Sequence, residues 1–395
     1  MSVGLANWKF SSIRNKMATY RRAQGNYYLK GKPIVTLENG SKVFSLLTPP
    51  LGSPAARRRI RLIMNNMSAL SALMGRGKGL PLAARTPHVT TVAITYNCQC
   101  SCRHCSAAHL QQEVRRNRSA MKYEELHDAI CQAVDLGCTC VVLTGGEPLL
   151  YDRVFDLIAA VDRRRSVCTV FTNGEYLVES KVENLKKAGV FGVFVSLDHS
   201  NPSRHDANRG RPGLFDKAAQ GLARCQRAGI PTGISTYATK EKIRDGELDA
   251  MMDLAKTLNV LELFVFDVIP TGRLSDQREC LLDKNEVHAL REFRSKYNSK
   301  PDYPRIIHQT MFSTIAYPCV AEGCPAGMVS VHIRANGDVC PCDFTPHSFG
   351  NLRSQSLGDI WQSMTENKLY AKPSARCRLS QPGFWDKLDE LRTAH

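Results

Sequence analysis

The sequence predicts an α/β fold, a partial (β/α)6 barrel of the TIM type with an added region at each end of the chain. Two observations support this prediction. From residue 91 onwards, short β-branched apolar runs alternate with longer amphipathic stretches, which is the pattern of successive strand–helix units. Gly137, Gly189 and Gly229 follow three of these stretches, at the position where glycine commonly ends a helix. Parallel strands joined by helices close towards a barrel that carries its reactive residues on the loops after the strands.

The alternation predicts six strand–helix units. Strands are expected at residues 91–95, 138–144, 167–172, 190–197, 232–237 and 261–268. Helices are expected at residues 122–136, 151–164, 178–188, 215–228, 248–258 and 284–297. A chain of 395 residues with 43% hydrophobic content is large enough to bury the core of such a barrel.

Three cysteines, Cys98, Cys102 and Cys105, follow the first predicted strand without a fourth partner at matching spacing. A structural zinc site uses four ligands, and a disulfide framework needs an even number of cysteines in an oxidising compartment. Three thiolates suit a 4Fe–4S cluster whose fourth iron remains open to a small molecule. Cys100 lies between them, and we interpret it as a bystander.

The spacing Cys98-x3-Cys102-x2-Cys105 resembles the radical S-adenosylmethionine (radical SAM) superfamily. The segment Thr144-Gly145-Gly146-Glu147-Pro148, which follows the second predicted strand, strengthens the resemblance because both motifs occur in the order that the family shows. The resemblance covers roughly residues 90 to 300. It implies a partial (β/α)6 barrel and a 4Fe–4S cluster held by the three cysteines together with exchangeable S-adenosylmethionine (SAM).

The resemblance also implies SAM contacts at the ends of the second, third and fourth predicted strands. The glycine-rich turn would receive the amino group of the methionine moiety, a polar turn would lie near the ribose, and the next loop would add a hydroxyl and a guanidinium. The residues at these positions are Gly145, Gly146, Glu147, Thr172, Asn173, Ser196 and Arg209. For Ser196 and Arg209, roles in loop capping and in an internal ion pair remain open alternatives.

A second group of cysteines surrounds an alternating segment broken by Asn336-Gly337, which predicts a β-hairpin. The arrangement resembles the SPASM or twitch-like extension of radical SAM enzymes. It implies one auxiliary 4Fe–4S cluster held by Cys319, Cys324, Cys342 and Cys377, with Cys340 as the rival of Cys319. A zinc ion held by the same four thiolates is the open alternative.

The residue after Cys342 is Asp343, at a position where some relatives use an acid to remove a substrate proton. The resemblance therefore makes Asp343 the candidate catalytic base.

We expect three domains: a basic extension over residues 1–88, the barrel over 89–305 and the auxiliary domain over 306–395. Residues 1–90 carry 15 Lys and Arg against the single acid Glu38, so the extension holds most of the net charge of +16. A short hairpin and an amphipathic helix are predicted there. The extension either packs on the barrel or docks on an anionic membrane surface, a negatively charged peptide or nucleic acid.

The leading functional hypothesis is an oxidoreductase that cleaves SAM reductively and abstracts hydrogen from a peptide or protein side chain, as maturases do. A lipid, tetrapyrrole or other small molecule at a membrane surface is the alternative substrate. A zinc-stapled nucleic-acid-binding module is the alternative from another class. A flavodoxin or ferredoxin type protein would donate electrons to the enzyme.

The sequence lacks an apolar run long enough to span a bilayer and a signal-peptide core in residues 1–10, and its fifteen cysteines suit a reducing compartment. We therefore expect a cytoplasmic protein, for which the basic extension offers a means of peripheral membrane contact.

Overall fold

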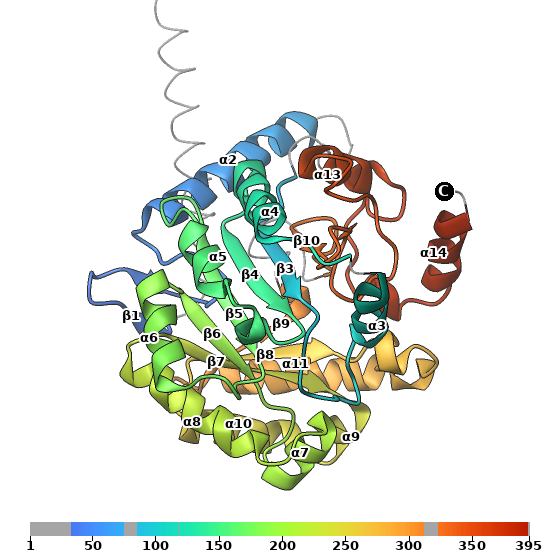
Figure 1. The fold of residues 1–395 in the computed structure, drawn as a ribbon. Coiled ribbons are helices and arrows are strands. Elements are labelled where there is room, and N and C mark those ends of the chain that lie inside the picture. Colours follow the sequence, from blue (N-terminus) through green and yellow to red (C-terminus); the bar gives the residue numbers. More distant parts are fainter. Residues whose placement is uncertain (1–32, 75–84, 118, 312–322, 394–395) are drawn as a thin grey trace, which may run out of the picture.

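The computed structural model describes residues 33–74, 85–117, 119–311 and 323–393, and its centre is one sheet of nine strands (Figure 1). The strand order is β11-β10-β3-β4-β5-β6-β7-β8-β9. Six neighbouring strands correspond to the six predicted from sequence: β3 (Val89–Thr95), β4 (Cys140–Gly145), β5 (Val167–Thr172), β6 (Gly192–Ser196), β7 (Thr232–Ala238) and β8 (Glu262–Asp267). All six run parallel, which confirms the prediction of successive strand–helix units.

Helices cover the outer face of this sheet (Figure 1). The six predicted helices are α4 (Tyr123–Leu136), α5 (Val154–Ala160), α6 (Glu179–Ala188), α8 (Leu214–Arg227), α10 (Glu247–Thr257) and α11 (Lys284–Asn298). Three further helices of the barrel region were not expected: α3 (Ala108–Asn117), α7 (Pro202–Arg209) and α9 (Lys240–Arg244). Each has few apolar residues and therefore gives only a weak apolar periodicity, which is the signal that sequence analysis uses.

The barrel is partial, as predicted. Two further strands run parallel to the six: β9 (Arg305–His308) beside β8, and β10 (Ser330–Ile333) beside β3. The strand β11 (Val339–Cys340) pairs antiparallel with β10 and forms the predicted hairpin. Within the described part of the chain, no pairing joins β9 to β10 or β11, so the sheet stays open there.

The barrel and the C-terminal region share one sheet, since β10 hydrogen bonds directly to β3. The expected domain boundary between residues 305 and 306 falls inside β9. The C-terminal region continues with α13 (Leu357–Glu366) and α14 (Phe384–Thr393). The division into residues 1–88, 89–305 and 306–395 stays a prediction.

The segment before the barrel closes its amino-terminal end. After the short hairpin of β1 (Val35–Thr36) and β2 (Lys42–Val43), Leu46 and Leu47 are buried in the apolar interior of the sheet. The backbone carbonyl of Leu46 accepts a hydrogen bond from Thr169 on β5 at 2.6 Å, and its N–H donates to Glu262 on β8 at 2.9 Å. The predicted N-terminal hairpin is therefore present, and the segment that follows it acts as a plug.

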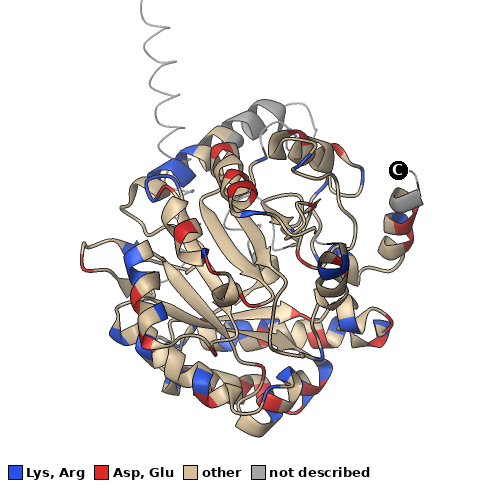
Figure 2. Ribbon diagram, viewed as in Figure 1, with Lys and Arg blue, Asp and Glu red and all other residues tan. Residues whose placement is uncertain are grey.

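The helix α2 (Pro54–Met74) contains the arginine run of the extension, whose basic residues lie in its first half (Figure 2). Arg58 donates to the backbone carbonyls of Cys138 and Arg165 at 2.9 and 3.0 Å, and Arg59 donates to Thr139 at 2.8 Å. Two arginines of the run thus bind the barrel itself. This favours packing over membrane or nucleic-acid docking for this part of the extension, while residues 1–32 lie outside the described residues.

The buried Glu262 predicts a pH-dependent stability. Burial raises the pKa of Glu262 to about 7, so the folded protein holds the proton more tightly than the unfolded chain does. Its contribution to stability is fully present below the unfolded pKa and is lost as the pH rises through 7. Between pH 4.5 and 7.5 we expect wild type to lose about 3 kcal/mol more unfolding free energy than Glu262→Gln.

Anaerobic urea unfolding at a series of pH values measures this difference. Glu241→Gln, at an exposed position on α9, is the matched control and should keep the wild-type slope. Equal slopes for wild type and Glu262→Gln would contradict the assignment.

Candidate active site

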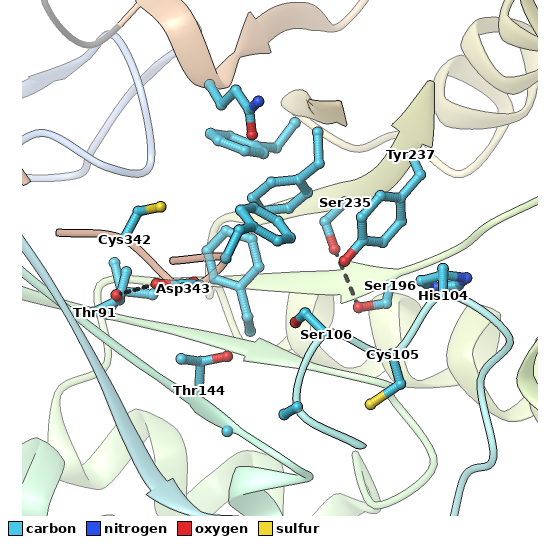
Figure 3. A pocket seen from close by; sticks show the side chains of 18 of the residues that line it. Thr91, His104, Cys105, Ser106, Thr144, Ser196, Ser235, Tyr237, Cys342 and Asp343 are labelled. Carbon is cyan, nitrogen blue, oxygen red and sulfur yellow. Dashed lines mark hydrogen bonds between the residues drawn. The ribbon is translucent and has the colours of Figure 1, made fainter. Parts of the chain in front are cut away.

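One cavity of about 260 Å³ runs from the carboxyl ends of the strands into the barrel. Leu47 of the plug lies at its inner end with Val89, Val142 and Phe264, and both groups of cysteines lie along it. The cavity therefore brings together residues from the N-terminal extension, the barrel and the C-terminal region. Figure 3 shows this arrangement, with Thr91, Cys342 and Asp343 on one side and His104, Cys105 and Ser196 on the other.

Cys98, Cys102 and Cys105, which we call the first cysteine group, all line this cavity. Two other loops hold the segment that carries them. Arg209 at the end of α7 accepts a hydrogen bond through its carbonyl from the N–H of Ser101 at 2.8 Å. The N–H of Arg273 donates to the carbonyl of Cys105 at 3.1 Å, and its guanidinium donates to the carbonyl of Ser101 at 2.6 Å. The loop therefore has a fixed position although it contains little regular structure.

Cys100 lies between two members of the first cysteine group. Its thiol forms hydrogen bonds with Cys98 and Cys102, and the bond to Cys102 lowers the pKa of that thiol to about 6. Burial instead raises the pKa of Cys105 to about 11. Cys100 also lines the cavity, together with the first cysteine group. Its interpretation as a bystander stays a prediction.

The donor set of the first cysteine group fits an iron–sulfur cluster. It consists of three thiols along one cavity, and a 4Fe–4S cluster binds each thiolate to a different iron. In the described part of the chain, no three His, Cys, Asp or Glu side chains converge on a point that would hold a single metal ion.

A buried ion pair anchors Arg209, whose backbone holds the segment of the first cysteine group. The Asp198 carboxylate accepts two hydrogen bonds from the Arg209 guanidinium, both at 2.8 Å, and both side chains are less than a tenth exposed. Burial disfavours both charges, but the pair keeps the pKa of Asp198 below and the pKa of Arg209 above their usual values. Arg209 thus forms an ion pair within this chain, with Asp198, which was the alternative that the sequence left open.

His104, the residue before Cys105, packs on the same ion pair. Its Nε2 lies 3.6 Å from Asp198, and its ring lies 4.3 Å from the ring of Tyr237. Burial lowers the pKa of His104 to about 4. His104 is therefore a neutral residue that packs between the ion pair and Tyr237.

The glycine-rich turn after β4 lies directly against the strand that leads to the cysteines. Gly145 has a φ of +132°, and a Cβ there would overlap the carbonyl oxygen of Thr95. A Cβ on Gly146 would overlap the carbonyl of Asn97. The N–H of Gly146 donates to Thr95 at 2.7 Å. Both glycines line the cavity, and this close approach requires that neither has a side chain.

Glu147 is fully buried and does not line the cavity. Its carboxylate accepts hydrogen bonds from the Thr172 hydroxyl at 2.7 Å, the Asn173 N–H at 2.8 Å and the Leu149 N–H at 3.0 Å. Burial raises the pKa of Glu147. Glu147 therefore fixes the turn after β5 in place. Its carboxylate oxygens already accept hydrogen bonds from groups of this chain.

The turn after β5 offers an unused donor. Thr172 and Asn173 line the cavity, and the side-chain Oδ1 of Asn173 accepts from the Gln99 amide at 3.2 Å and from the Glu175 N–H at 3.0 Å. The buried Asn173 Nδ2 has no partner among the described residues. A buried donor without a partner is costly unless a ligand satisfies it. The site therefore fits a polar ligand such as the sugar of SAM.

Ser196 at the end of β6 lines the same cavity, where its hydroxyl lies 3.1 Å from that of Ser235 on β7 (Figure 3). Both hydroxyls can rotate toward a ligand, because each can act as donor or acceptor. The structure thus places a pair of hydroxyls where sequence analysis expected one.

Cys324, Cys342 and Cys377, which we call the second cysteine group, line the far side of the cavity. A hydrogen bond between the thiols of Cys324 and Cys377 lowers the pKa of Cys324 to about 6, and burial raises the pKa of Cys342 to about 12. Cys319, the fourth ligand expected from sequence, lies outside the described residues.

Cys340, the rival of Cys319, does not join the second cysteine group. It is fully buried on β11, does not line the cavity, and its charged neighbours are Arg334, Asp338 and Asp343. β11 ends at Cys340, so Cys342 lies in the segment after the strand.

Asp343 lines the cavity beside Cys342 and is held by two side chains. Its Oδ1 accepts a hydrogen bond from the Thr91 hydroxyl at 2.5 Å and lies 2.9 Å from Nδ1 of His332 (Figure 3). Burial favours the protonated form, but His332 and Thr91 outweigh it and keep the pKa of Asp343 below its usual value. Sequence analysis missed both partners, since only the pairing of β10 with β3 brings His332 and Thr91 together.

The remaining wall of the cavity is largely aromatic. Phe266 packs against Phe264, Tyr237 and Phe344 with ring centroids 4.4, 5.6 and 6.0 Å apart. Among the described residues that line the cavity, the sole Lys or Arg is Arg209, which Asp198 already pairs. The wall therefore favours an uncharged, apolar group.

Comparison with known families agrees with this geometry. The model of the radical SAM superfamily matches residues 92–255, and the SPASM model, an iron-sulfur cluster-binding domain, matches residues 324–379. Together these domains imply a 4Fe–4S cluster with SAM and an auxiliary cluster. The alternative of a zinc-stapled nucleic-acid-binding module is wrong, because the matched families consist of enzymes that use radical chemistry.

Several characterised proteins are similar over most of the chain. An AdoMet-dependent heme synthase of Methanosarcina barkeri is 28% identical over 70% of this chain and 82% of its own length. The PqqA peptide cyclase of Rhizobium meliloti is 25% identical over 70% of this chain and 73% of its own length. The crystal structure of Streptococcus suis SuiB bound to the precursor peptide SuiA superposes with a TM-score of 0.59, at 20% identity, over 80% of this chain and 70% of that one. The last similarity supports the fold.

The buried pair predicts a large loss of stability when one partner is removed. Arg209→Met leaves the Asp198 carboxylate buried without its cation, which we expect to lower the free energy of unfolding by about 3–5 kcal/mol. Arg211→Met is the matched control, because Arg211 also contacts a carboxylate at 2.8 Å but from an exposed position. Anaerobic urea unfolding should show a much smaller loss for the control. Equal losses in the two variants would contradict the structural role of the buried pair.

Proposed function

The chain belongs to the radical SAM superfamily and carries a SPASM domain, and we propose that it abstracts hydrogen from an apolar carbon of a peptide or protein side chain. The observation that carries the proposal is the single cavity, along which both cysteine groups, the glycine-rich turn and an apolar wall follow one another. A reaction that begins at one cysteine group and ends near the other requires this arrangement.

We assign the first cysteine group to the 4Fe–4S cluster that binds SAM. When bound, the cluster and SAM together supply the 5′-deoxyadenosyl radical that removes the hydrogen atom. Gly145 and Gly146 present backbone to the methionine moiety, and Asn173 supplies its unused amide donor. Thr172 and Ser196 complete the polar wall.

Two residues of the assigned SAM site act through others. Glu147 holds Thr172 and Asn173, and Arg209 holds Asp198 and the backbone of Ser101. We therefore propose them as positioning residues. Their burial leaves no free charge for SAM itself, because each is already paired inside the chain.

We assign Cys324, Cys342 and Cys377 to the auxiliary 4Fe–4S cluster, with Cys319 as the fourth ligand. The separation of Cys340 from these three thiols favours Cys319 over its rival. In domain terms we propose a basic extension over residues 1–88, a catalytic barrel over 89–305 and an auxiliary domain over 306–395, with β10 as the strand that joins the last two.

The wall of the cavity supports a peptide side chain as the substrate. A tetrapyrrole with several carboxylates would need cations, since a buried charge is stable only when it is paired. The described lining offers Arg209 alone, which is engaged with Asp198. A lipid at a membrane surface would use the basic extension, in which Arg58 and Arg59 bind the barrel instead.

Asp343 is the proposed base. It faces the cavity, its pKa lies below the usual value, and Thr91 and His332 fix its orientation. An ionised carboxylate in this position can accept the proton that a substrate loses when it is oxidised.

We propose that a flavodoxin or ferredoxin type protein donates electrons to the enzyme. We also propose that the enzyme is cytoplasmic. No helix in the described ranges is long and apolar enough to cross a membrane.

Iron content tests the assignment of the two cysteine groups. Anaerobic reconstitution should give about eight irons per chain, as two 4Fe–4S clusters require, and dithionite should drive formation of 5′-deoxyadenosine. Replacing the first cysteine group by alanine should leave about four irons and abolish SAM cleavage. Cys377→Ala should also leave about four irons, whereas Cys340→Ala, the matched control, should keep all eight. Loss of a cluster in Cys340→Ala would contradict the ligand assignment.

Asp343→Asn separates SAM cleavage from substrate oxidation. We expect formation of 5′-deoxyadenosine within about twofold of wild type, together with a loss of about 100-fold or more in product from any peptide that wild type converts. Mass spectrometry of nucleoside and peptide in one reaction measures both. Thr91→Val, which removes a hydrogen bond but keeps the carboxylate, should lose much less product formation. Wild-type product formation in Asp343→Asn would exclude it as the base.

A further inference from the structure

A second, smaller cavity of about 60 Å³ opens on the outer side of the barrel, between α11 and the segment 375–380. Three arginines, Arg291, Arg294 and Arg376, line it together with His308, and we call it the basic pocket. Its floor is apolar and includes Val265, Leu282, Val287, Leu290 and Ile306. An apolar floor with a charged rim is the pattern of a protein contact.

The basic pocket shares a wall with the active-site cavity. Cys377 and Thr310 line both. Because Cys377 is a proposed ligand of the auxiliary cluster, that cluster would lie at the wall that the two cavities share. A partner protein seated in the basic pocket would approach the auxiliary cluster more closely than the first cysteine group, whose members line only the active-site cavity.

The charges of Arg291 and Arg376 are available to a partner. In the ranges that the structure describes, no ion pair joins Arg291 or Arg376 to a carboxylate, and Glu292 next to Arg291 pairs with His288 instead. The one carboxylate in the lining, Asp267, accepts hydrogen bonds from His308 at 2.8 Å and from Gln309 at 3.0 Å. Arg291 and Arg376 therefore outnumber the one lining carboxylate, Asp267, which His308 and Gln309 already hold, so the basic pocket is positive.

The overall distribution of charged residues does not distinguish this face from the other faces of the molecule. Figure 2 shows Lys and Arg interspersed with Asp and Glu over most of the outer helices. Several exposed arginines elsewhere are paired, as Arg211 is with Glu175 and Arg353 with Glu125. What distinguishes Arg291 and Arg376 is the absence of such a partner within the described chain, combined with their place beside Cys377.

We propose that the basic pocket is the docking site of a small acidic one-electron carrier protein, which exchanges electrons with the auxiliary cluster through Cys377. Carboxylates of the carrier would bind the arginines, whose planar guanidinium groups suit bidentate contacts, and opposite charge would speed the encounter. The inference rests on the proposed auxiliary cluster. It adds a place and a partner for the electron that leaves the substrate.

The electron balance follows from the proposed reaction. After hydrogen abstraction, the substrate radical loses one electron and one proton to become a closed-shell product. Asp343 accepts the proton. The electron passes by way of the second cysteine group to the oxidised carrier, which leaves reduced by one electron.

Binding of flavodoxin to the reconstituted holoenzyme tests the docking site. The probe is oxidised bacterial flavodoxin, titrated at low and high salt while its flavin fluorescence is followed. We expect the double variant Arg291→Glu/Arg376→Glu to raise the dissociation constant at low salt by about tenfold or more, and to flatten its salt dependence. Arg163→Glu/Arg164→Glu, an equal charge change on an exposed loop before β5, should shift it less than about twofold.

A second pair of variants decides where the carrier docks. Arg115→Glu/Arg116→Glu lies on α3, next to the first cysteine group. If flavodoxin affinity falls in this variant and not in Arg291→Glu/Arg376→Glu, the basic pocket is not the docking site. Wild-type affinity in Arg291→Glu/Arg376→Glu, at full iron content and native circular dichroism, overturns the proposal in the same way.

Electron transfer gives an independent readout. Holoenzyme reduced with dithionite and then desalted should pass electrons to oxidised flavodoxin, and Arg291→Glu/Arg376→Glu should slow this reaction by about tenfold at low salt. An unchanged rate would contradict the proposal. Cleavage of SAM with dithionite needs no carrier protein. If wild type fails to cleave SAM under these conditions, the proposed function is contradicted, whereas the binding titration still tests the docking site.

Discussion

The first cysteine group depends on backbone hydrogen bonds that come from two distant loops. Arg209 and Arg273 lie far along the chain from Ser101, yet their groups hold the segment on which Cys98, Cys102 and Cys105 are carried. The buried pair of Arg209 with Asp198 anchors one of these loops below the thiols. Three thiolates can share a cluster only if their backbone is fixed in advance, so the rest of the site relies on this constraint.

The cavity acquires its shape because the barrel is closed by other parts of the chain. The plug around Leu46 seals the amino-terminal end, and the hairpin of β10 and β11 adds a wall beside β3. Asp343 and Cys342 follow that hairpin and therefore face the same space as the first cysteine group. A largely apolar space that reaches into the barrel limits the access of water and other hydrogen donors, which a reactive radical requires.

Sequence analysis predicted the six strand–helix units because their apolar periodicity is local. It predicted the cysteines that line the cavity because their spacing is a family signature. It could not predict that Glu147 and Arg209 point inward to Thr172 and Asp198, since such choices depend on the packing of neighbouring loops. The partners of Asp343 were equally hidden, because the pairing of β10 with β3 joins segments about 240 residues apart.

The proposed assignment of the first cysteine group requires one iron that no thiolate of this chain binds, so that SAM can bind it. Electron paramagnetic resonance of dithionite-reduced protein tests it most directly, with Cys324 and Cys377 replaced so that one cluster remains. Addition of SAM should shift the g-values of that cluster, because the cofactor binds an iron directly. A spectrum that stays the same at saturating SAM, with all three thiolates intact, would contradict the account.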